Sequence, residues 1–238
     1  MQYIVLIIAS FIAALISGAV GFGGALILLP IVTISVGAEV AVPVLTIAQL
    51  IGNISRVSFG IKQVDWKSVA LFCSTALPLS ALGAFGFSVL PTDIVTRFIG
   101  VALIILVLFK MIKKIELKGN KKTLLIGGAM TGALSGLAGS GGPIGAAIFL
   151  SLGLPPVAYI ASEAATAVAI HTLKTFIYSN LIDVGIYAIM VGLSMGLAMI
   201  GGTYFANKFI KNMDKDKFQK YIAILLCAVG IYMLITGA

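Results

Sequence analysis

The same glycine-rich octapeptide occurs twice in this chain, each time inside a long apolar stretch. It reads SGAVGFGG at residues 17–24 and SGLAGSGG at residues 135–142, 118 residues further on. Four glycines in eight positions usually break a helix, because each glycine weakens it by roughly 1 kcal/mol. In lipid, the backbone amides freed by such a break must be buried in protein or line a cavity, since each unsatisfied amide costs several kcal/mol. The pair therefore indicates both an internal duplication and a site.

The apolar stretches around the octapeptides are typical of an integral membrane protein. The chain is 60% hydrophobic and only 10% charged, with a mean hydropathy of +1.15, unlike a soluble domain. Its apolar stretches cover residues 3–37, 40–60, 66–90, 94–111, 123–154, 157–182, 185–209 and 221–235. Most are long enough for a spanning helix of about 20 residues. We therefore expect an all-α, multi-pass protein of the cell membrane. Cys73 and Cys227 lack the spacing of metal or redox motifs, so we expect neither a metal nor a cofactor.

The two halves of the chain resemble each other beyond the octapeptide. A shift of 118 residues also aligns Ile8 with Ile126, Ala70 with Ala188, Asp65 with Asp183 and Gly83 with Gly201. Near the end the shift becomes 123, which implies a short insertion around residues 211–215. We predict two homologous halves, residues 1–118 and 119–238, that together form one membrane domain.

The positions of lysine and arginine favour inverted repeats. If every apolar stretch crossed once, the short basic segments at residues 110–122 and 208–220 would lie on opposite sides, although such loops prefer the cytoplasm. The conflict disappears if the first stretch of each half is a re-entrant hairpin of two half-helices with the glycines at its tip. Residues 3–17 would extend about 22 Å as a helix, less than the roughly 30 Å hydrocarbon core. Each half then has one broken segment and three spanning helices, with basic loops in the cytoplasm and both termini outside.

The glycine segments have the features of an anion site. A helix starts again after the glycines, and Pro143 stands where a first-turn proline belongs. The free amides and the positive dipole end of a helix start favour an anion, and two inverted copies would surround one small ligand, as in secondary transporters. The alternative is that these glycines serve only close helix packing, which is how we interpret Gly83, Gly86, Gly201 and Gly202. The predicted binding residues are Ser17, Gly18, Gly21, Phe22, Gly23, Gly24, Ser135, Gly136, Gly139, Ser140, Gly141 and Gly142.

Polar residues inside the spans add side chains to this site. Gln49, Asn53 and Arg56 are spaced i, i+4 and i+7 and so share one helix face. His171 and Lys174 occupy the matching positions of the second half. Charged groups at membrane depth are costly, so they face a cavity or pair with one another. We predict that these polar residues contact the anion through Asn53, Arg56, His171 and Lys174.

Two of the intramembrane groups could titrate during proton-coupled transport. Glu163 is the acid deepest inside a span, and His171 is the only histidine, a residue type that changes charge near neutral pH. The alternative is a structural ion pair of Glu163 with Lys174 or Arg56, with His171 as a hydrogen-bonded residue of the bundle. Asp65 and its equivalent in the other half lie at span ends, where capping or turn chemistry is expected.

At the paired SGxxGxGG segments, Asn53 in the following span and the basic loop between the halves, the chain resembles the TauE/SafE family of sulfite and organosulfonate exporters. The resemblance covers the whole chain. It implies a multi-pass permease of two related halves that handles small sulfur-containing anions such as sulfite and sulfoacetate. It carries over to Ser17, Gly18, Gly21, Gly23 and Gly24 and to Ser135, Gly136, Gly139, Gly141 and Gly142. The expected partners are the sulfur-containing anion and the lipid bilayer, with a homo-oligomer as an open alternative.

We therefore predict a secondary transporter that exports small sulfur-containing anions by alternating access. The enzymatic alternative is a rhomboid-like intramembrane serine protease, because Ser140 lies in AGSG and His171 follows it. An anion channel is the other alternative. The net charge of +8 does not indicate a nucleic-acid partner, because the basic residues fall beside membrane spans.

Overall fold

All regular elements in the described part of the chain are helices. The computed structural model describes residues 2–36, 38–86, 119–139, 141–181 and 185–210, together with residues 214, 217, 224, 228, 231 and 235. The predicted stretch 94–111 lies outside these residues, as does most of 221–235. The all-α prediction is confirmed over the described part. Its elements are α1 (Gln2–Val20), α2 (Gly24–Val36), α3 (Ala38–Gly60), the short 3-10 helix η1 (Ile61–Gln63), α4 (Trp66–Gly86), α6 (Lys121–Ala138), α7 (Gly142–Ser151), α8 (Pro156–Leu181) and α9 (Gly185–Ile210).

Four of the described helices are long and apolar enough to cross a membrane. These segments are Tyr3–Val20, Val40–Gln63, Trp66–Gly86 and Gly185–Lys208. By contrast, α2 has 13 residues and α7 has 10, which corresponds to about 20 Å and 15 Å of helix. Neither short helix could cross a hydrocarbon core of roughly 30 Å. Each follows one of the glycine segments, so each half contains a long helix, a glycine turn and a short helix.

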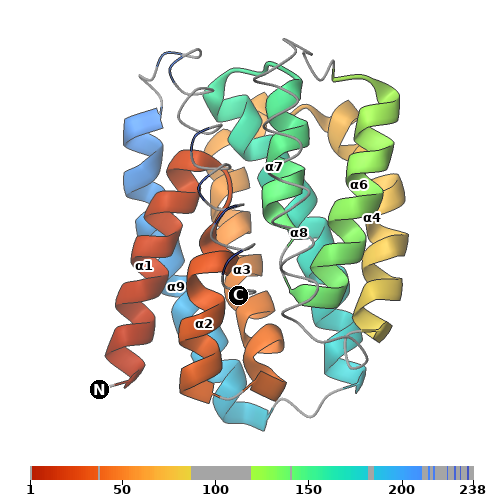
Figure 1. Ribbon diagram of the computed structural model, residues 1–238. Helices are drawn as coiled ribbons and strands as arrows, with labels where there is room; N and C mark the ends of the chain where they lie inside the picture. The colour runs from red at the N-terminus through yellow and green to blue at the C-terminus, as the bar shows by residue number, and fades with distance from the viewer. Residues whose placement is uncertain are drawn as a thin grey trace.

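The helices of the two halves run in opposite directions (Figure 1). In the first half, α1 runs upward in this view, α2 returns downward, α3 runs up and α4 runs down. In the second half, α6 runs downward, α7 returns upward, α8 runs down and α9 runs up. The two glycine turns therefore face each other from hairpins that begin at opposite ends of the bundle.

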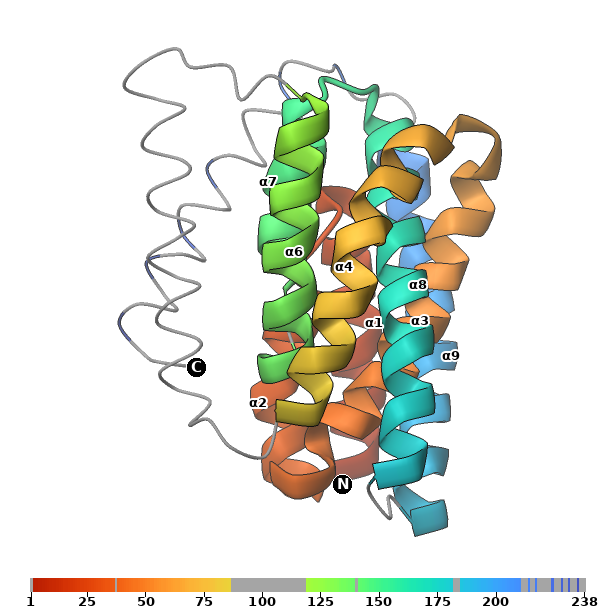
Figure 2. The same cartoon turned by 90° about the vertical axis from the view of Figure 1, so that its right-hand side faces the viewer.

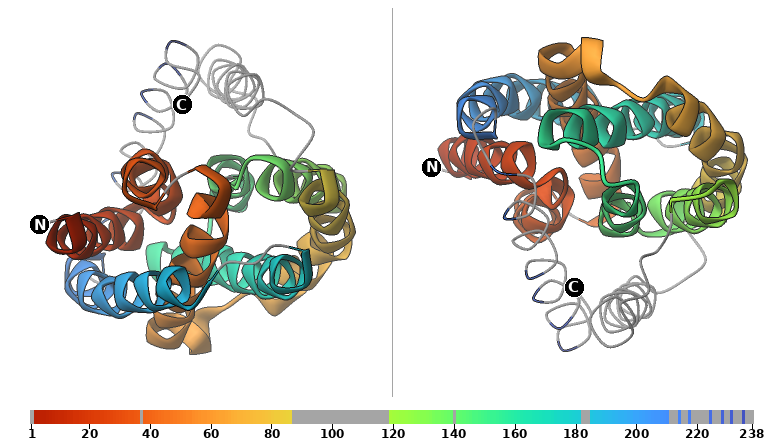
Figure 3. Two further views of the ribbon diagram at one scale, coloured as in Figure 1. Left: turned by 90° about the horizontal axis from the view of Figure 1, so that it is seen from below. Right: turned by 90° about the horizontal axis from the view of Figure 1, so that it is seen from above.

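Among the described helices, most of the packing joins one half of the chain to the other. α1 packs against α9, and α6 packs against α4, which lies beside it in Figure 2. Seen end-on, α1, α2 and α9 lie on one side and α4, α6 and α7 on the other, with α3 and α8 between these groups (Figure 3). α3 contacts α8 and α9, while α8 contacts α4. These contacts are equivalent in the two halves: α1 with α9 corresponds to α6 with α4, and α3 with α9 corresponds to α8 with α4. The contact of α3 with α8 corresponds to itself.

Glycines bring several of these helices to backbone contact. A Cβ atom added to Gly128, Gly132 or Gly136 of α6 would lie 2.3, 2.1 or 2.4 Å from a backbone oxygen of α4. A Cβ atom on Gly202 of α9 would lie 2.2 Å from a backbone oxygen of α1. The packing role predicted for Gly202 agrees with this contact, and the repeated spacing of four residues on α6 is the pattern of small residues at membrane helix interfaces.

The first helix of each half continues further into its glycine segment than expected. Ser17 and Gly18 are helical, and α1 ends only at Val20. Its 19 residues extend about 28 Å, compared with the 22 Å expected for residues 3–17. A Cβ atom on Gly18 would lie 2.7 Å from the Cβ atom of Ala206. Close packing against α9 therefore stabilises the helix at Gly18, where the glycine itself weakens it by roughly 1 kcal/mol.

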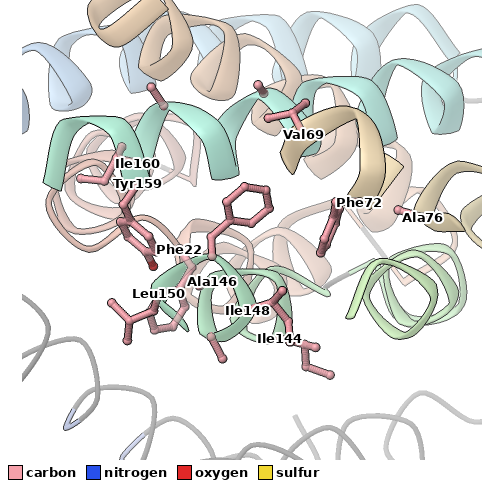
Figure 4. Packing of buried hydrophobic residues seen from close by; sticks show 14 of the residues in the cluster. Phe22, Val69, Phe72, Ala76, Ile144, Ala146, Ile148, Leu150, Tyr159 and Ile160 are labelled. Carbon is pink, nitrogen blue, oxygen red and sulfur yellow. The ribbon is translucent and has the colours of Figure 1, made fainter. Parts of the chain in front are cut away.

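The tip of the first hairpin is buried in the apolar core of the second half. Phe22 is 2% exposed and lies among side chains of α7 and α8, beside Tyr159 (Figure 4). Ile144 and Phe149 of α7 belong to the same cluster. Because one ring fixes the tip against two helices of the other half, the glycine turn has a defined position at the centre of the bundle.

Candidate functional site

Both glycine segments form turns that end one helix and start another. Gly21 and Gly23 have φ angles of +95° and +99°, and Gly139 has +72°. Backbone of this kind favours glycine, which has no Cβ atom. The Gly21 amide donates to the Ser17 carbonyl oxygen at 2.7 Å and so closes the end of α1. In the second half, α7 starts at Gly142 with a proline in its first turn, as predicted.

A cavity of about 50 Å³ lies where the two turns meet. We call it the central cavity. A single water needs about 10–15 Å³ by a comparable measure, so the space suits a few waters or one small oxyanion. α2, α3, α6, α7 and α8 all contribute to its wall. The lining residues are Phe22, Gly23, Gly24, Ala25, Gln49, Asn53, Arg56, Thr131, Ser135, Gly139, Gly141, Gly142, Pro143, Glu163, Thr166, Ala167, Ile170 and His171.

The wall of the central cavity offers unused hydrogen-bonding groups. Gln49 Nε2, Thr131 Oγ1 and His171 Nδ1 are buried and have no hydrogen-bond partner within the described part of the chain. The first residues of α2 and α7 also line the cavity, and the first amides of a helix lack partners within that helix. A buried polar group without a partner is costly. A ligand or water in the cavity would satisfy these groups.

Arg56 ties the tip of the first hairpin to the rest of the site. Its Nη1 donates to the backbone oxygens of Gly21, at 2.6 Å, and Ser17, at 3.2 Å. These carbonyls end α1, where the helix dipole favours a cation. Its Nη2 donates to the Asn53 side-chain oxygen and lies 3.4 Å from Glu163 Oε2. The guanidinium therefore connects α1, α3 and α8.

Lys174 has the equivalent position at the second hairpin. Its Nζ donates to the Ser135 backbone oxygen at 2.7 Å, near the end of α6. The side chain is fully buried, and its Nζ lies 5.7 Å from the centre of the Tyr178 ring. A shift of 118 residues turns Arg56 into Lys174 and Ser17 into Ser135, so each half uses one cation to hold the end of its own first helix.

The two alternatives for the ion pair of Glu163 are distinguished by the geometry. Glu163 pairs with Arg56, whose side chain is 6% exposed against 5% for the acid. Asn53 Nδ2 donates to the Gln49 backbone oxygen at 2.7 Å, which orients its side-chain oxygen toward the guanidinium. The pair joins α3 of the first half to α8 of the second.

Most of the predicted site residues meet in the central cavity. Ser17, Gly21 and Lys174 do not line it and instead take part in the backbone contacts at the ends of α1 and α6. Gly18 and Gly136 do not line it either, because they pack against α9 and α4. Ser140 lies outside the described residues. The predicted residues in the wall are Phe22, Gly23, Gly24, Asn53, Arg56, Ser135, Gly139, Gly141, Gly142, Glu163 and His171.

Three polar lining residues were absent from the predicted binding set. Gln49 precedes Asn53 by one helical turn, and its face of the helix is recognisable in the sequence. Thr131 likewise precedes Ser135 by one turn, a spacing that places both on one face. Thr166 donates its hydroxyl to the Glu163 backbone oxygen at 2.7 Å. Gln49 already belongs to the polar face predicted with Asn53 and Arg56, so taking that whole face into the binding set would have included it. Thr131 would have been found by extending the face of Ser135 by one turn.

A comparison with known protein families identifies the class of protein to which this chain belongs. Residues 6–233 match the family described as sulfite exporter TauE/SafE. The chain belongs to the TauE/SafE family. This confirms the resemblance drawn from the paired octapeptides and makes the chain a multi-pass membrane transporter of the kind that handles sulfite and related sulfur anions. The protease alternative built on Ser140 and His171 was wrong, because this family consists of transporters and not enzymes. No curated protein and no solved structure matches the chain.

Proposed function

We propose that this TauE/SafE protein is a secondary transporter that exports small sulfur-containing anions, such as sulfite or organosulfonates, by alternating access. The central cavity is the observation that carries the proposal. Two helix starts, from hairpins of opposite halves, line one cavity together with buried polar groups that have no partner among the described residues. Helix starts favour anions, and the space of about 50 Å³ suits a small oxyanion group.

In this proposal, the residues of the wall contact the anion and a second set positions them. The contact set is Gly23, Gly24, Asn53, Arg56, Ser135, Gly141, Gly142 and His171, with Gln49 and Thr131 added. Lys174 does not contact the anion, because its ammonium group is already hydrogen-bonded to the Ser135 backbone oxygen. It attracts the anion by its positive charge and holds Ser135 in position. Ser17 and Gly21 hold Arg56 in place.

We further propose that the halves are inverted repeats with re-entrant first hairpins. The opposite directions of the α1–α2 and α6–α7 hairpins support this arrangement (Figure 1). So does the distribution of charge, because Lys62, Lys67, Lys121, Lys122 and Lys208 are exposed at the upper end of the bundle in this view. We call this end the basic face and assign it to the cytoplasm. Epitope tags at both termini should be accessible from outside the cell, and cytoplasmic access to both would refute the topology.

Glu163 is the acid proposed to carry a proton, because its pair with Arg56 lies in the cavity wall. A proton on Glu163 weakens that pair and leaves Arg56 free to bind the anion. In Glu163→Gln, anion flux should lose its dependence on a proton gradient. His171→Gln tests the other candidate. Coupling that survives in both variants would exclude these groups as proton carriers.

The primary test is a thermal-shift panel on the purified protein with sulfite, sulfate, thiosulfate, sulfoacetate and taurine. An anion that binds only the folded state adds about 2.7 kcal/mol of stability at a concentration of 100 Kd. Ser135→Ala should reduce the shift, because Ser135 lines the cavity. Ser74→Ala is the matched control, because Ser74 is exposed on α4. Absence of any shift, together with cation flux in proteoliposomes, would overturn the proposal.

A further inference from the structure

Arg56 lines two cavities. One is the central cavity, and the other is a smaller space of about 20 Å³. We call the smaller space the outer cavity. Its wall includes Gly18, Phe59, Gly60, Thr203 and Asn207, from α1, α3 and α9, and residues from the start of α8. Arg56 is therefore the residue that the walls of the two cavities share.

The outer cavity lies toward the basic face. Gly60 is the last residue of α3, and Val157 stands in the first turn of α8. Asn207 stands in the last turn of α9. These three helix ends lie at the upper end of the bundle in Figure 1, the end that carries Lys62 and Lys208. The two cavities therefore follow one another from the middle of the bundle toward the basic face.

Besides Arg56, the wall of the outer cavity contains two polar residues, Thr203 and Asn207. Thr203 is 3% exposed, and its Oγ1 has no hydrogen-bond partner among the described residues. Asn207 contributes an amide that is only half-buried. The neighbouring helices are already in close contact: a Cβ atom on Gly18 would lie 2.7 Å from Ala206 Cβ, and one on Gly60 would lie 2.7 Å from Ala161 Cβ. An opening at this level therefore requires helices to separate.

The contacts of Arg56 indicate which helices those are. Its Nη1 is bound to two carbonyls at the end of α1, at 2.6 and 3.2 Å, while its Nη2 lies 3.4 Å from Glu163 of α8. A shift of α8 away from the first hairpin would break the longer contact with Glu163 and leave the other two intact. The guanidinium would stay on the hairpin, with N–H donors released toward the passage.

We infer that the anion moves between the central cavity and the basic face through the outer cavity, and that the Arg56–Glu163 pair is the gate between them. This inference rests on the proposed function. It assigns a second polar site, at Thr203 and Asn207, on the route of a small sulfonate or sulfite group.

Cysteine accessibility tests the route. In a background without Cys73 and Cys227, Asn207→Cys is exposed to a membrane-impermeant sulfonatoethyl thiosulfonate, itself a small sulfonate anion, from each side of the vesicle. Lys62→Cys reports which side carries the basic face. Asn207→Cys should react from the same side as Lys62→Cys, and its modification should abolish anion flux. Tyr204→Cys, on the exposed side of α9, is the matched control, and its treatment should leave flux unchanged. Thr203→Cys provides a second test if Asn207→Cys does not yield folded protein.

The gate is tested by labelling inside the central cavity. Ser135→Cys should react with the same reagent from the basic face, and Glu163→Gln should increase its rate, because the pair that closes the passage is lost. Labelling of Asn207→Cys only from the side opposite to Lys62→Cys would overturn the route, as would full flux after its modification. A labelling rate of Ser135→Cys unaffected by Glu163→Gln would overturn the gate. If the proposed function itself is wrong, unlabelled protein will show no anion flux. The labelling rates would still show whether the route is open from the basic face.

Discussion

Replacing Gly21 by alanine should destabilise the protein more than replacing Gly23, although both glycines have nearly the same φ angle. At +95° and +99°, either alanine costs about 1–2 kcal/mol of backbone strain. Only Gly21 adds a steric cost, because its new Cβ atom would lie 2.5 Å from Tyr159 Cε1, whereas nothing lies within 4 Å at Gly23. Tyr159 is 1% exposed and belongs to the buried cluster around Phe22, so its ring can move only by displacing other side chains. Overpacking of this kind costs about 1–3 kcal/mol.

The free energy of unfolding in a denaturant titration of the purified protein measures the difference. Gly21→Ala should cost about 2–5 kcal/mol and Gly23→Ala about 1–2 kcal/mol. A double-mutant cycle isolates the steric part: in a Tyr159→Leu background, which removes the ring, Gly21→Ala should cost no more than Gly23→Ala. Equal costs for the two alanines in the wild-type background would refute the reasoning, as would a cost at Gly21 that the Tyr159→Leu background leaves unchanged.

Three further substitutions test separate contacts. In Gly136→Ala the new Cβ atom would lie 2.4 Å from a backbone oxygen of α4, so the substitution should cost about 1–3 kcal/mol of stability. It should not reduce the anion-induced thermal shift. Gly86→Ala is the matched control, because its Cβ atom would meet only the end of a side chain, at 3.3 Å. Asp65→Ala removes the carboxylate that accepts the first-turn amide of α4 at 3.2 Å and should cost about 1 kcal/mol in the same denaturant titration, whereas Asp65→Asn should recover most of it. Thr131→Val removes a buried hydroxyl that has no described partner, so stability should be unchanged or higher while the thermal shift with the bound anion decreases; an unchanged shift would exclude Thr131 from the site.

Residues that form the site through local spacing were predictable from the sequence. Asn53 and Arg56 share a face of α3 and meet the predicted glycine turns in the central cavity. The capping role expected for Asp65 is present too, since it accepts the Ser68 amide and hydroxyl at the start of α4. Its counterpart Asp183 lies outside the described residues. In these cases the interacting residues are separated by only a few positions along the chain, so their spacing in the sequence is enough to predict the contact.

Contacts between distant segments were not predictable in the same way. Gly18 and Gly136 belong to the two octapeptides, yet they pack against helices of the opposite half. The sequence does not predict this contact, because a glycine has no side chain whose character would indicate what its face of the helix touches. The use of Arg56 and Lys174 to bind carbonyls at the ends of α1 and α6 was missed for a related reason. Every residue has a backbone oxygen, so the sequence does not show which of them a basic side chain binds. A lysine or arginine that binds backbone carbonyls therefore cannot be distinguished in the sequence from one that binds a ligand.

The exchange of packing partners between halves has a consequence for biosynthesis. Among the described helices, α4 packs mainly against α6 and α8, and α9 packs mainly against α1 and α3. α4 therefore completes these contacts only after residues 121–181 have entered the membrane. We therefore expect the first half to remain incompletely packed in the membrane until the second half has been inserted. For the same reason, the two halves produced as separate polypeptides should assemble into a working transporter, whereas either one produced alone should be degraded.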